Sequence, residues 1–232
     1  VPDSELASYF AEVSRPRRVQ HALVQVGERI VRGDPGVGRW YPQVIEAAAS
    51  PNPELRQTAA WIMGQDRRYE PFRTALHRML EDSSLLARRN AALALAGFRD
   101  PAARPALREM LRTYTVRAPA PGPVSFRLKA GEYVNPGTLV ARIGQEEVRS
   151  PLPGEVRSLS RPGGAQVEKN DPLLELSPDE KHVWEALRGL WAVGGEDELE
   201  DIGRYARGIA GMPDRVRQQA ALTAQAIRAR RQ

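Results

Sequence analysis

Few residues in this chain combine the type and spacing that catalysis or metal binding requires. The 232 residues include no cysteine, which excludes disulfides, thiolate metal ligands and thiol nucleophiles. The three histidines, His21, His77 and His182, lie in separate segments, and no two have the spacing of metal ligands. Residues 161–164 lack the lysine and hydroxyl of a phosphate-binding loop. We therefore expect no catalytic residues, no metal ligands and no bound cofactor.

The arginines offer a different chemistry, the binding of acidic groups. Lys and Arg number 34 against 29 Asp and Glu, a net charge of +5. Four arginines near the starts of similar segments would align if those segments stack: Arg56, Arg88, Arg89 and Arg217. Such a ladder could bind nucleic acid or an acidic protein. We favour the simpler interpretation, in which these arginines pair with Asp and Glu of neighbouring repeats.

Helical patterns position these arginines on both sides of residues 116–176. Apolar residues follow helical spacing from position 19 to position 30. Asn52-Pro53 and Asp100-Pro101 predict helix starts, because the first side chain caps free amides and proline tolerates the first helical position. Ser177, with Glu three positions later, predicts another start.

Apolar spacing also assigns large side chains to the helical core. Trp61, Trp184 and Trp191 follow the helical period, and we expect all three to be buried.

The helical segments are themselves repeated. The pair Ala59-Ala60 recurs 32 positions later as Ala91-Ala92, which allows neighbouring helices to approach closely. The spacing returns after residue 177. Residues 19–113 resemble HEAT repeats of the bacterial short type, which also occur in phycobilisome-lyase-like proteins. The resemblance implies an α-solenoid that presents binding surfaces.

Residues 116–176 contain a different repeat. Val116 recurs 32 positions later as Val148, and Val134 recurs 33 positions later as Val167. The doubled pattern predicts two β-rich halves related by a pseudo-two-fold axis, neither of which buries its apolar face alone.

The repeated Val-Arg-x-Pro-x-Pro-Gly pattern resembles the biotinyl/lipoyl-type barrel-sandwich hybrid. Carrier members of that family attach their cofactor to a lysine in the hairpin between the halves. Here four residues, Gly144, Gln145, Glu146 and Glu147, join the halves, and none is a lysine. We therefore expect no covalent biotin or lipoate. The segment is also similar to adaptor domains of bacterial membrane-fusion proteins, which implies a rigid docking module with contacts at residues 144–147.

These patterns predict a multidomain α and β protein. HEAT-like helix pairs of an α-solenoid occupy 1–115 and 178–232, and an all-β barrel-sandwich hybrid occupies 116–177. The leading hypothesis is a non-catalytic scaffold or adaptor subunit that binds other protein subunits of a membrane or envelope complex. The alternatives are binding of nucleic acid or an acidic partner, and a bilin lyase-like enzyme suggested by the repeat type alone.

Location depends on two features of the sequence. The chain begins at Val1 without Met, and it contains no cysteine. With the likeness to envelope adaptors, this favours a periplasmic or membrane-associated protein, with the cytoplasm as the alternative.

Overall fold

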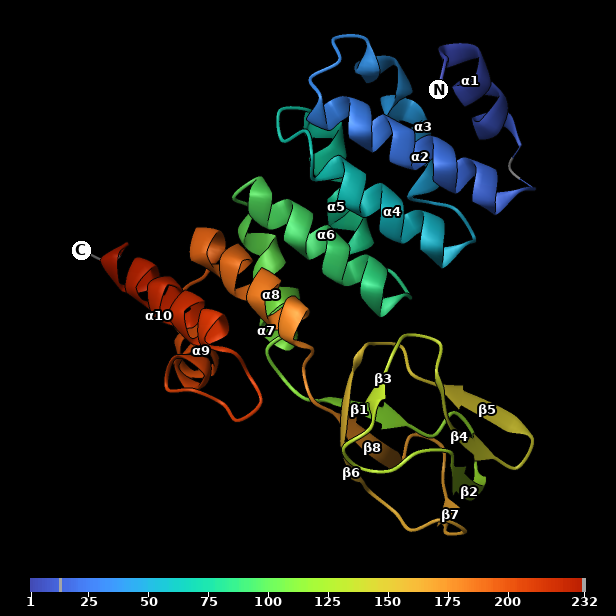
Figure 1. The fold of residues 1–232 in the computed structure, drawn as a ribbon, viewed down its shortest axis with the longest axis vertical. Helices are drawn as coiled ribbons and strands as arrows, with labels where there is room; N and C mark the ends of the chain where they lie inside the picture. Colours follow the sequence, from blue (N-terminus) through green and yellow to red (C-terminus); the bar gives the residue numbers. More distant parts are fainter. Residues whose placement is uncertain (13, 231–232) are drawn as a thin grey trace. The chain divides into compact units, whose positions relative to one another are not determined.

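The computed structural model describes residues 1–12 and 14–230, and the chain divides into two compact units (Figure 1). Unit 1 contains residues 1–107 and 192–194, and unit 2 contains 108–191 and the chain from 195 onward. In the part of the chain described, no helix has the length and apolar character needed to span a bilayer.

Unit 1 is a stack of helices with short turns between them. Its elements are α1 (Asp3–Ala11), α2 (Pro16–Val31), η1 (Val37–Trp40), α3 (Tyr41–Ala47), α4 (Pro53–Met63), α5 (Glu70–Met79), α6 (Leu85–Gly97) and η2 (Pro101–Ala103). Helices α2, α4 and α6 lie side by side, while α5 packs against α4 and α6 (Figure 1). The chain passes into unit 2 within α7 (Arg104–Glu109).

Small side chains make the close stacking of α4 and α6 possible. Ala59, Ala60, Ala91 and Ala92 are all fully buried, as their spacing predicts. A Cβ at Gly64, which follows the last residue of α4, would lie 3.0 Å from the Cβ of Ala94, so a larger residue there would require α6 to shift.

The predicted starts at Asn52 and Asp100 are confirmed. The Asn52 Oδ1 atom accepts a hydrogen bond of 2.8 Å from the amide of Glu54. Asp100 Oδ1 accepts one of 3.0 Å from the amide of Ala102. Both side chains therefore satisfy amides that have no partner within the first turn.

Unit 2 contains a β module, defined here as residues 114–176. Its strands are β1 (Tyr114–Arg117), β2 (Gly122–Phe126), β3 (Tyr133–Val134), β4 (Leu139–Ile143), β5 (Glu146–Arg149), β6 (Gly154–Leu159), β7 (Gln166–Val167) and β8 (Pro172–Leu176). They form two four-stranded sheets, ordered β1-β8-β6-β3 and β5-β4-β2-β7, in which all neighbours are antiparallel.

The strand orders reveal the symmetry that the doubled sequence predicts. Exchanging β1 with β5, β2 with β6, β3 with β7 and β4 with β8 converts one sheet into the other. Each sheet therefore contains strands from both sequence halves, and the halves interlock. Apolar residues of both halves are buried between them, including Val116, Val124, Val148, Val156, Leu173 and Leu174.

The register follows the same symmetry. Tyr114 pairs with Leu176 where the chain enters and leaves the module, and Glu146 pairs with Ile143 beside the β4–β5 hairpin. Tyr114 and Glu146 are 32 positions apart in sequence, and Ile143 and Leu176 are 33 positions apart, so the two pairs occupy equivalent positions in the two halves. The connection to the helices and the hairpin therefore occupy matching places in the two halves.

Helices return after the module as α8 (Glu180–Val193), α9 (Leu199–Ala206) and α10 (Asp214–Ala229), with η3 (Glu196–Glu198) between α8 and α9. Asp201 on α9 accepts hydrogen bonds from Arg108 Nε at 2.7 Å and from Arg112 Nη2 at 2.8 Å. Tyr205 donates a 2.7 Å hydrogen bond to the carbonyl of Leu111. These hydrogen bonds join residues that precede the β module to residues that follow it.

The predicted cap at Ser177 is wrong. The Ser177 amide donates to the carbonyl of Glu155 at 2.8 Å, so this residue continues the pairing of β8 with β6 and does not cap a helix. Helix α8 begins at Glu180, and Asp179 Oδ1 accepts from the amide of His182 at 3.1 Å. Proline at position 178 thus separates strand from helix.

Tyr133 ties the β module to the start of α8. Its hydroxyl donates a 2.8 Å hydrogen bond to Asp179 Oδ2. Partial desolvation, together with the hydrogen bond to this carboxylate, raises the pKa of Tyr133 to about 12. The symmetry-equivalent residue is Gln166, which makes this contact a point where the two halves differ.

Candidate interaction surfaces

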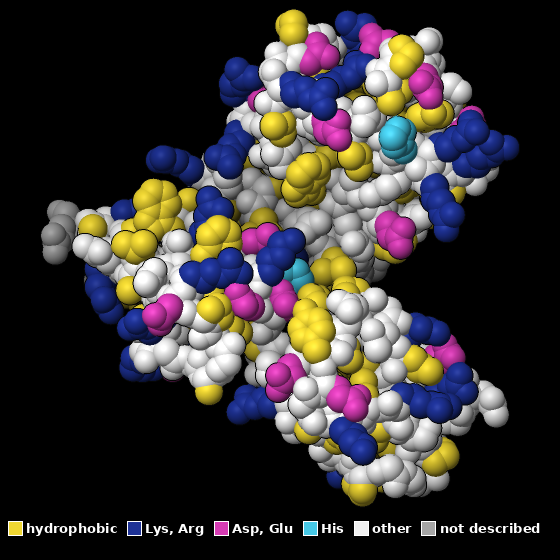
Figure 2. All heavy atoms as spheres, in the orientation of Figure 1, with side chains coloured by type: hydrophobic (Ala, Val, Ile, Leu, Met, Phe, Trp, Pro, Cys, Tyr) yellow, Lys and Arg dark blue, Asp and Glu magenta, His cyan; other side chains and the backbone are white. Residues whose placement is uncertain are grey.

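An exposed apolar row lies on α2 and α4 of unit 1. Trp61, Val24 and Val31 have exposed fractions of 50%, 37% and 69%. Val24 and Val31 are seven residues apart, so they share one face of α2. Gly27 lies between them, and a Cβ added there would come within 3.1 Å of the Trp61 ring. We call Val24, Val31 and Trp61 the Trp61 row; Figure 2 shows apolar side chains at the surface of this unit.

The expectation that the three tryptophans are buried is wrong for Trp61 and Trp191, which are each 50% exposed. Trp184 is partly covered: the guanidinium carbons of Arg188 and Arg215 lie 4.7 and 5.8 Å from its ring centroid. Helical spacing identifies residues that share a face, but it does not say whether another element covers that face.

The sequence contains one signal that points to the Trp61 row. Gly27 interrupts an otherwise regular helical pattern, and an interior helical glycine costs about 1 kcal/mol relative to alanine. Such a glycine usually has a packing reason, and here the reason is the indole ring that rests against it.

Arg56 and Arg88 both converge on the turn at Asp82. Arg56 makes a two-pronged ion pair with Asp82, with Nε–Oδ2 and Nη2–Oδ1 distances of 2.7 and 2.9 Å. Its third nitrogen, Nη1, donates to the carbonyl of Ser50 at 2.8 Å. Arg88 donates to the carbonyl of Asp82. Much of the hydrogen-bonding capacity of the Arg56 guanidinium is therefore used within unit 1.

The other two candidate arginines have different surroundings. Arg89 lies on α6 and is only 9% exposed. Arg217 is in unit 2, where its Nη2 lies 3.1 Å from Asp214 Oδ1. The predicted ladder is thus divided between the two units, with three members in unit 1 and one in unit 2.

Three aspartates, Asp82, Asp100 and Asp201, have side chains that are less than 10% exposed, and each pairs with arginines of a neighbouring segment. Burial alone would raise the pKa of Asp82, but hydrogen bonds from Arg56 and the Ser84 amide outweigh it and lower that pKa. At Asp201 burial is likewise outweighed by Arg112 and Arg108, so its pKa is lowered. The pKa of Asp100 is lowered in the same way by the Ala102 amide, Arg73 and His77.

Residues 144–147 are all exposed. Only Gly144 and Gln145 join β4 to β5, because Glu146 and Glu147 are the first two residues of β5, so the connection is a two-residue turn and is shorter than the sequence predicts. Gly144 has a φ of +58°, a left-handed conformation that suits glycine at this tight turn. Glu147 accepts hydrogen bonds from Arg142 at 2.7 Å and from Arg149 at 2.6 Å. These two arginines lower the pKa of Glu147. The hairpin end of the module therefore carries alternating charge.

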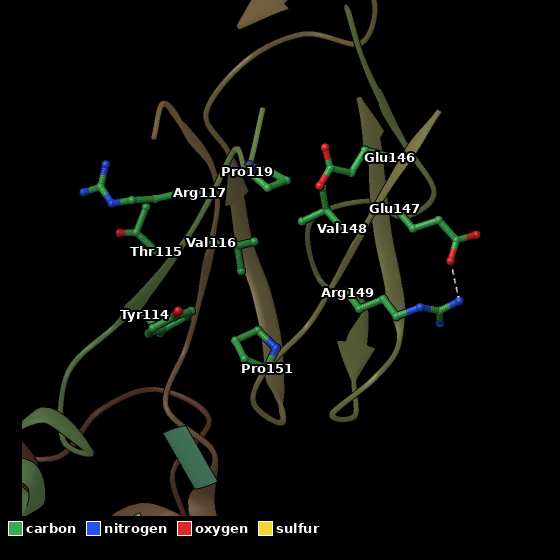
Figure 3. A pocket seen from close by; sticks show the side chains of 10 residues that line it. All are labelled: Tyr114, Thr115, Val116, Arg117, Pro119, Glu146, Glu147, Val148, Arg149 and Pro151. Atoms are coloured by element: carbon green, nitrogen blue, oxygen red, sulfur yellow. Dashed lines mark hydrogen bonds and ion pairs between the residues drawn. The ribbon is translucent and has the colours of Figure 1, made fainter. Parts of the chain in front are cut away.

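A groove of about 470 Å³ lies beside this hairpin (Figure 3). One wall comes from β1 and the residues after it, and the other comes from β5 and the residues after it. The ten residues that line it form five symmetry-equivalent pairs, each 32 positions apart: Tyr114 and Glu146, Thr115 and Glu147, Val116 and Val148, Arg117 and Arg149, and Pro119 and Pro151. The groove therefore lies on the pseudo-two-fold axis of the module.

The histidines have structural partners. His77 Nε2 lies 2.7 Å from Asp100 Oδ2, the same atom that accepts a 2.6 Å hydrogen bond from Arg73. Because Asp100 also caps η2, this carboxylate stabilises the local fold. His21 packs edge-on against Tyr9. Among residues 1–12 and 14–230, no cluster of three or more His, Asp or Glu side chains is suited to a metal ion.

Part of the helical region matches a known family. Residues 41–120 match the family model of HEAT repeats. The matched HEAT region runs from α3 into the start of the β module, and it includes the Asp82 turn and Trp61. It overlaps most of residues 19–113, for which the sequence predicts such repeats. No curated protein matches the chain.

Proposed function

We propose that this protein is a non-catalytic scaffold or adaptor subunit that binds a partner protein through the Trp61 row. The observation that carries the proposal is the half-exposed indole of Trp61 within the HEAT region. HEAT repeats commonly bind proteins through their helical faces.

The composition of the row suits a protein partner. Tryptophan is enriched among residues that dominate binding energy at protein interfaces, because it offers a large and rigid apolar surface. Val24 and Val31 extend that surface along α2. Its border is polar: Gln20 and Thr58 are hydrogen-bonded to each other at 2.6 Å between neighbouring helices. An apolar centre with a polar border is typical of specific interfaces.

Nucleic-acid binding receives less support from the geometry. The ion pair with Asp82 and the bond to Ser50 leave the Arg56 guanidinium little capacity for a phosphate. Arg88 is directed to the same turn. Basic charge in the HEAT region thus stabilises the repeats, which makes an apolar protein contact the better-supported function.

The β module is part of the same proposal, as an unmodified biotinyl/lipoyl-like barrel-sandwich domain inserted between helical repeats. The symmetry-related strand orders of the two sheets support this assignment. The hairpin that would present an attached cofactor contains Gly144, Gln145, Glu146 and Glu147, so the proposed role of the module is docking. Its likeness to membrane-fusion adaptors is the reason for proposing an assembly at the cell envelope.

Co-purification of matched variants tests the Trp61 row. The wild-type protein, Trp61→Ala and Glu54→Ala would be affinity-purified from membrane and cytosolic fractions of the native cell. Glu54 is exposed on the same helix. Its backbone amide donates the hydrogen bond to Asn52 Oδ1, so removing the Glu54 side chain leaves the helix cap in place. We expect one stoichiometric partner with the wild type and with Glu54→Ala, and its loss with Trp61→Ala. Equal recovery with all three proteins would contradict the proposal.

A further inference from the structure

The edges of the two sheets are unequal. Strands β3 and β7 at one pair of edges contain two residues each, whereas β1 and β5 at the other pair contain four each. In the β module, which is described throughout, β5 pairs with β4 and with no other strand. Its outer edge therefore presents main-chain groups that can extend the sheet.

Backbone alternation identifies these outward groups. The Ser150 amide donates to the Thr138 carbonyl, and the Ser150 carbonyl accepts from the Gly137 amide, each at 2.8 Å. Successive residues of an antiparallel strand direct their main-chain groups to opposite sides. Because Ser150 faces β4, the main-chain groups of Arg149 and Glu147 face away from it.

This edge is complementary to itself. In an antiparallel pair of two copies of β5, the outward groups of Glu147 meet those of Arg149 of the second copy. The same register places Arg149 opposite Glu147 of the second copy, and Val148 opposite Val148. Opposite charges facing each other across strands stabilise a sheet, whereas like charges would oppose pairing.

We propose that the outer edge of β5 pairs with β5 of a second copy of this chain, forming a two-fold symmetric dimer. The charged side chains are accessible for this contact: Glu147 and Arg149 have side-chain exposed fractions of 37% and 54%. Reciprocal contacts between the same residues are what a two-fold interface requires. A four-residue strand buries less surface than a standard interface, so the dimer is weak and depends on concentration.

A charge-reversal series on the full chain tests the dimer. Molar mass would be measured by sedimentation over a wide concentration range for the wild type, Glu147→Arg and Glu147→Arg/Arg149→Glu. The single variant places Arg opposite Arg at both reciprocal positions, and we expect the dissociation constant to rise about tenfold. The double variant restores opposite charges in reverse order, and we expect the dimer to return.

Each remaining outcome overturns the proposal. A wild-type protein that stays monomeric at the highest concentration excludes the dimer. A dimer that Glu147→Arg does not weaken uses another surface. If the double variant has a native far-ultraviolet circular dichroism spectrum but does not recover dimerisation, the charge order across the strands does not control association.

A second single variant, Arg149→Glu, places Glu opposite Glu and is expected to weaken the dimer similarly.

Discussion

The HEAT region and the β module use sequence repeats of the same length in opposite ways. Ala59 recurs after 32 residues as Ala91, and Val116 recurs after 32 residues as Val148. In the HEAT region the apolar period is that of a helix, so the second copy stacks beside the first. In the β module the second copy exchanges strands with the first. The difference teaches that the period within a repeat, and not its length, decides between stacking and interlocking.

The two arrangements are also stabilised differently. Charged seams join the helical segments, as at Arg56–Asp82 and at Asp201 with Arg108 and Arg112. The β module is joined by apolar side chains from both halves and by close backbone contacts. Stacked repeats leave a face available for a partner, whereas the interlocked halves expose mainly their edges.

The largest effect is expected at a close backbone contact in the β module. A Cβ at Gly154 would lie 2.4 Å from the Ser177 carbonyl oxygen, so Gly154→Ala requires the backbone to move. At the equivalent Gly122 the nearest atom is a side-chain methyl of Ile143 at 3.0 Å. We expect urea unfolding to show a loss of about 3 kcal/mol for Gly154→Ala and about 1 kcal/mol for Gly122→Ala. Equal losses would contradict the assigned contacts.

The next effect is expected at a charged seam of unit 2. Asp201→Asn removes the charge that accepts hydrogen bonds from Arg108 and Arg112, and Asp201 is only 4% exposed. We expect a loss of about 2 kcal/mol in urea unfolding. Glu147→Gln, at an exposed ion pair in the β module, is the control and is expected to leave the unfolding midpoint unchanged. A urea unfolding midpoint for Asp201→Asn equal to that of the wild type would contradict the stabilising role of Asp201.

Lowering the pH should destabilise the helical segments before the β module, and we expect this effect to be smaller than that of Asp201→Asn. The pKa values of Asp82, Asp100 and Asp201 are lowered in the folded protein. Their contribution is present above the unfolded value of about 3.9 and is lost as the pH falls through the lower folded values. In the β module the pKa of exposed Glu147 is lowered in the same direction.

Tryptophan fluorescence can follow the acid transition, because all four tryptophans lie outside residues 114–176. We expect the fluorescence to change below about pH 4 while amide protons of the β module remain protected from exchange. If amide protons of the β module lost their protection from exchange at a higher pH than the fluorescence change, the predicted order of acid unfolding would be wrong.

The smallest effect on stability is expected at the exposed row. Trp61→Ala removes a ring that is half in water, so we expect a loss of about 1 kcal/mol in urea unfolding. Its effect on partner binding should be much larger, because an exposed indole is a strong anchor. A loss comparable to that of Gly154→Ala would indicate a role in the core instead.

The sequence predicts the repeated organisation well, because each repeat contains its own local signals. Asn52 and Asp100 cap the helices that their side-chain chemistry predicts. The doubled valines predict two β-rich halves, and the strand orders show how these halves combine.

The remaining features depend on contacts between distant segments. Ser177 has the chemistry of a cap, but its amide is held by Glu155, which lies in another strand. Trp61 has the spacing of a core residue, but the face on which it lies is only partly covered. Likewise, the pairing of Arg108 and Arg112 with Asp201 spans about ninety residues and has no local signal.

Site-specific photo-crosslinking tests the central claim most directly, that the stacked repeats present the Trp61 row to a partner protein. A photoreactive amino acid would be placed at position 61, and separately at position 54 of the same helix, in cells that produce the native protein. We predict one defined heterologous crosslink from position 61 and none from position 54. The same crosslinking pattern from both positions, or no heterologous crosslink from position 61, would contradict the account.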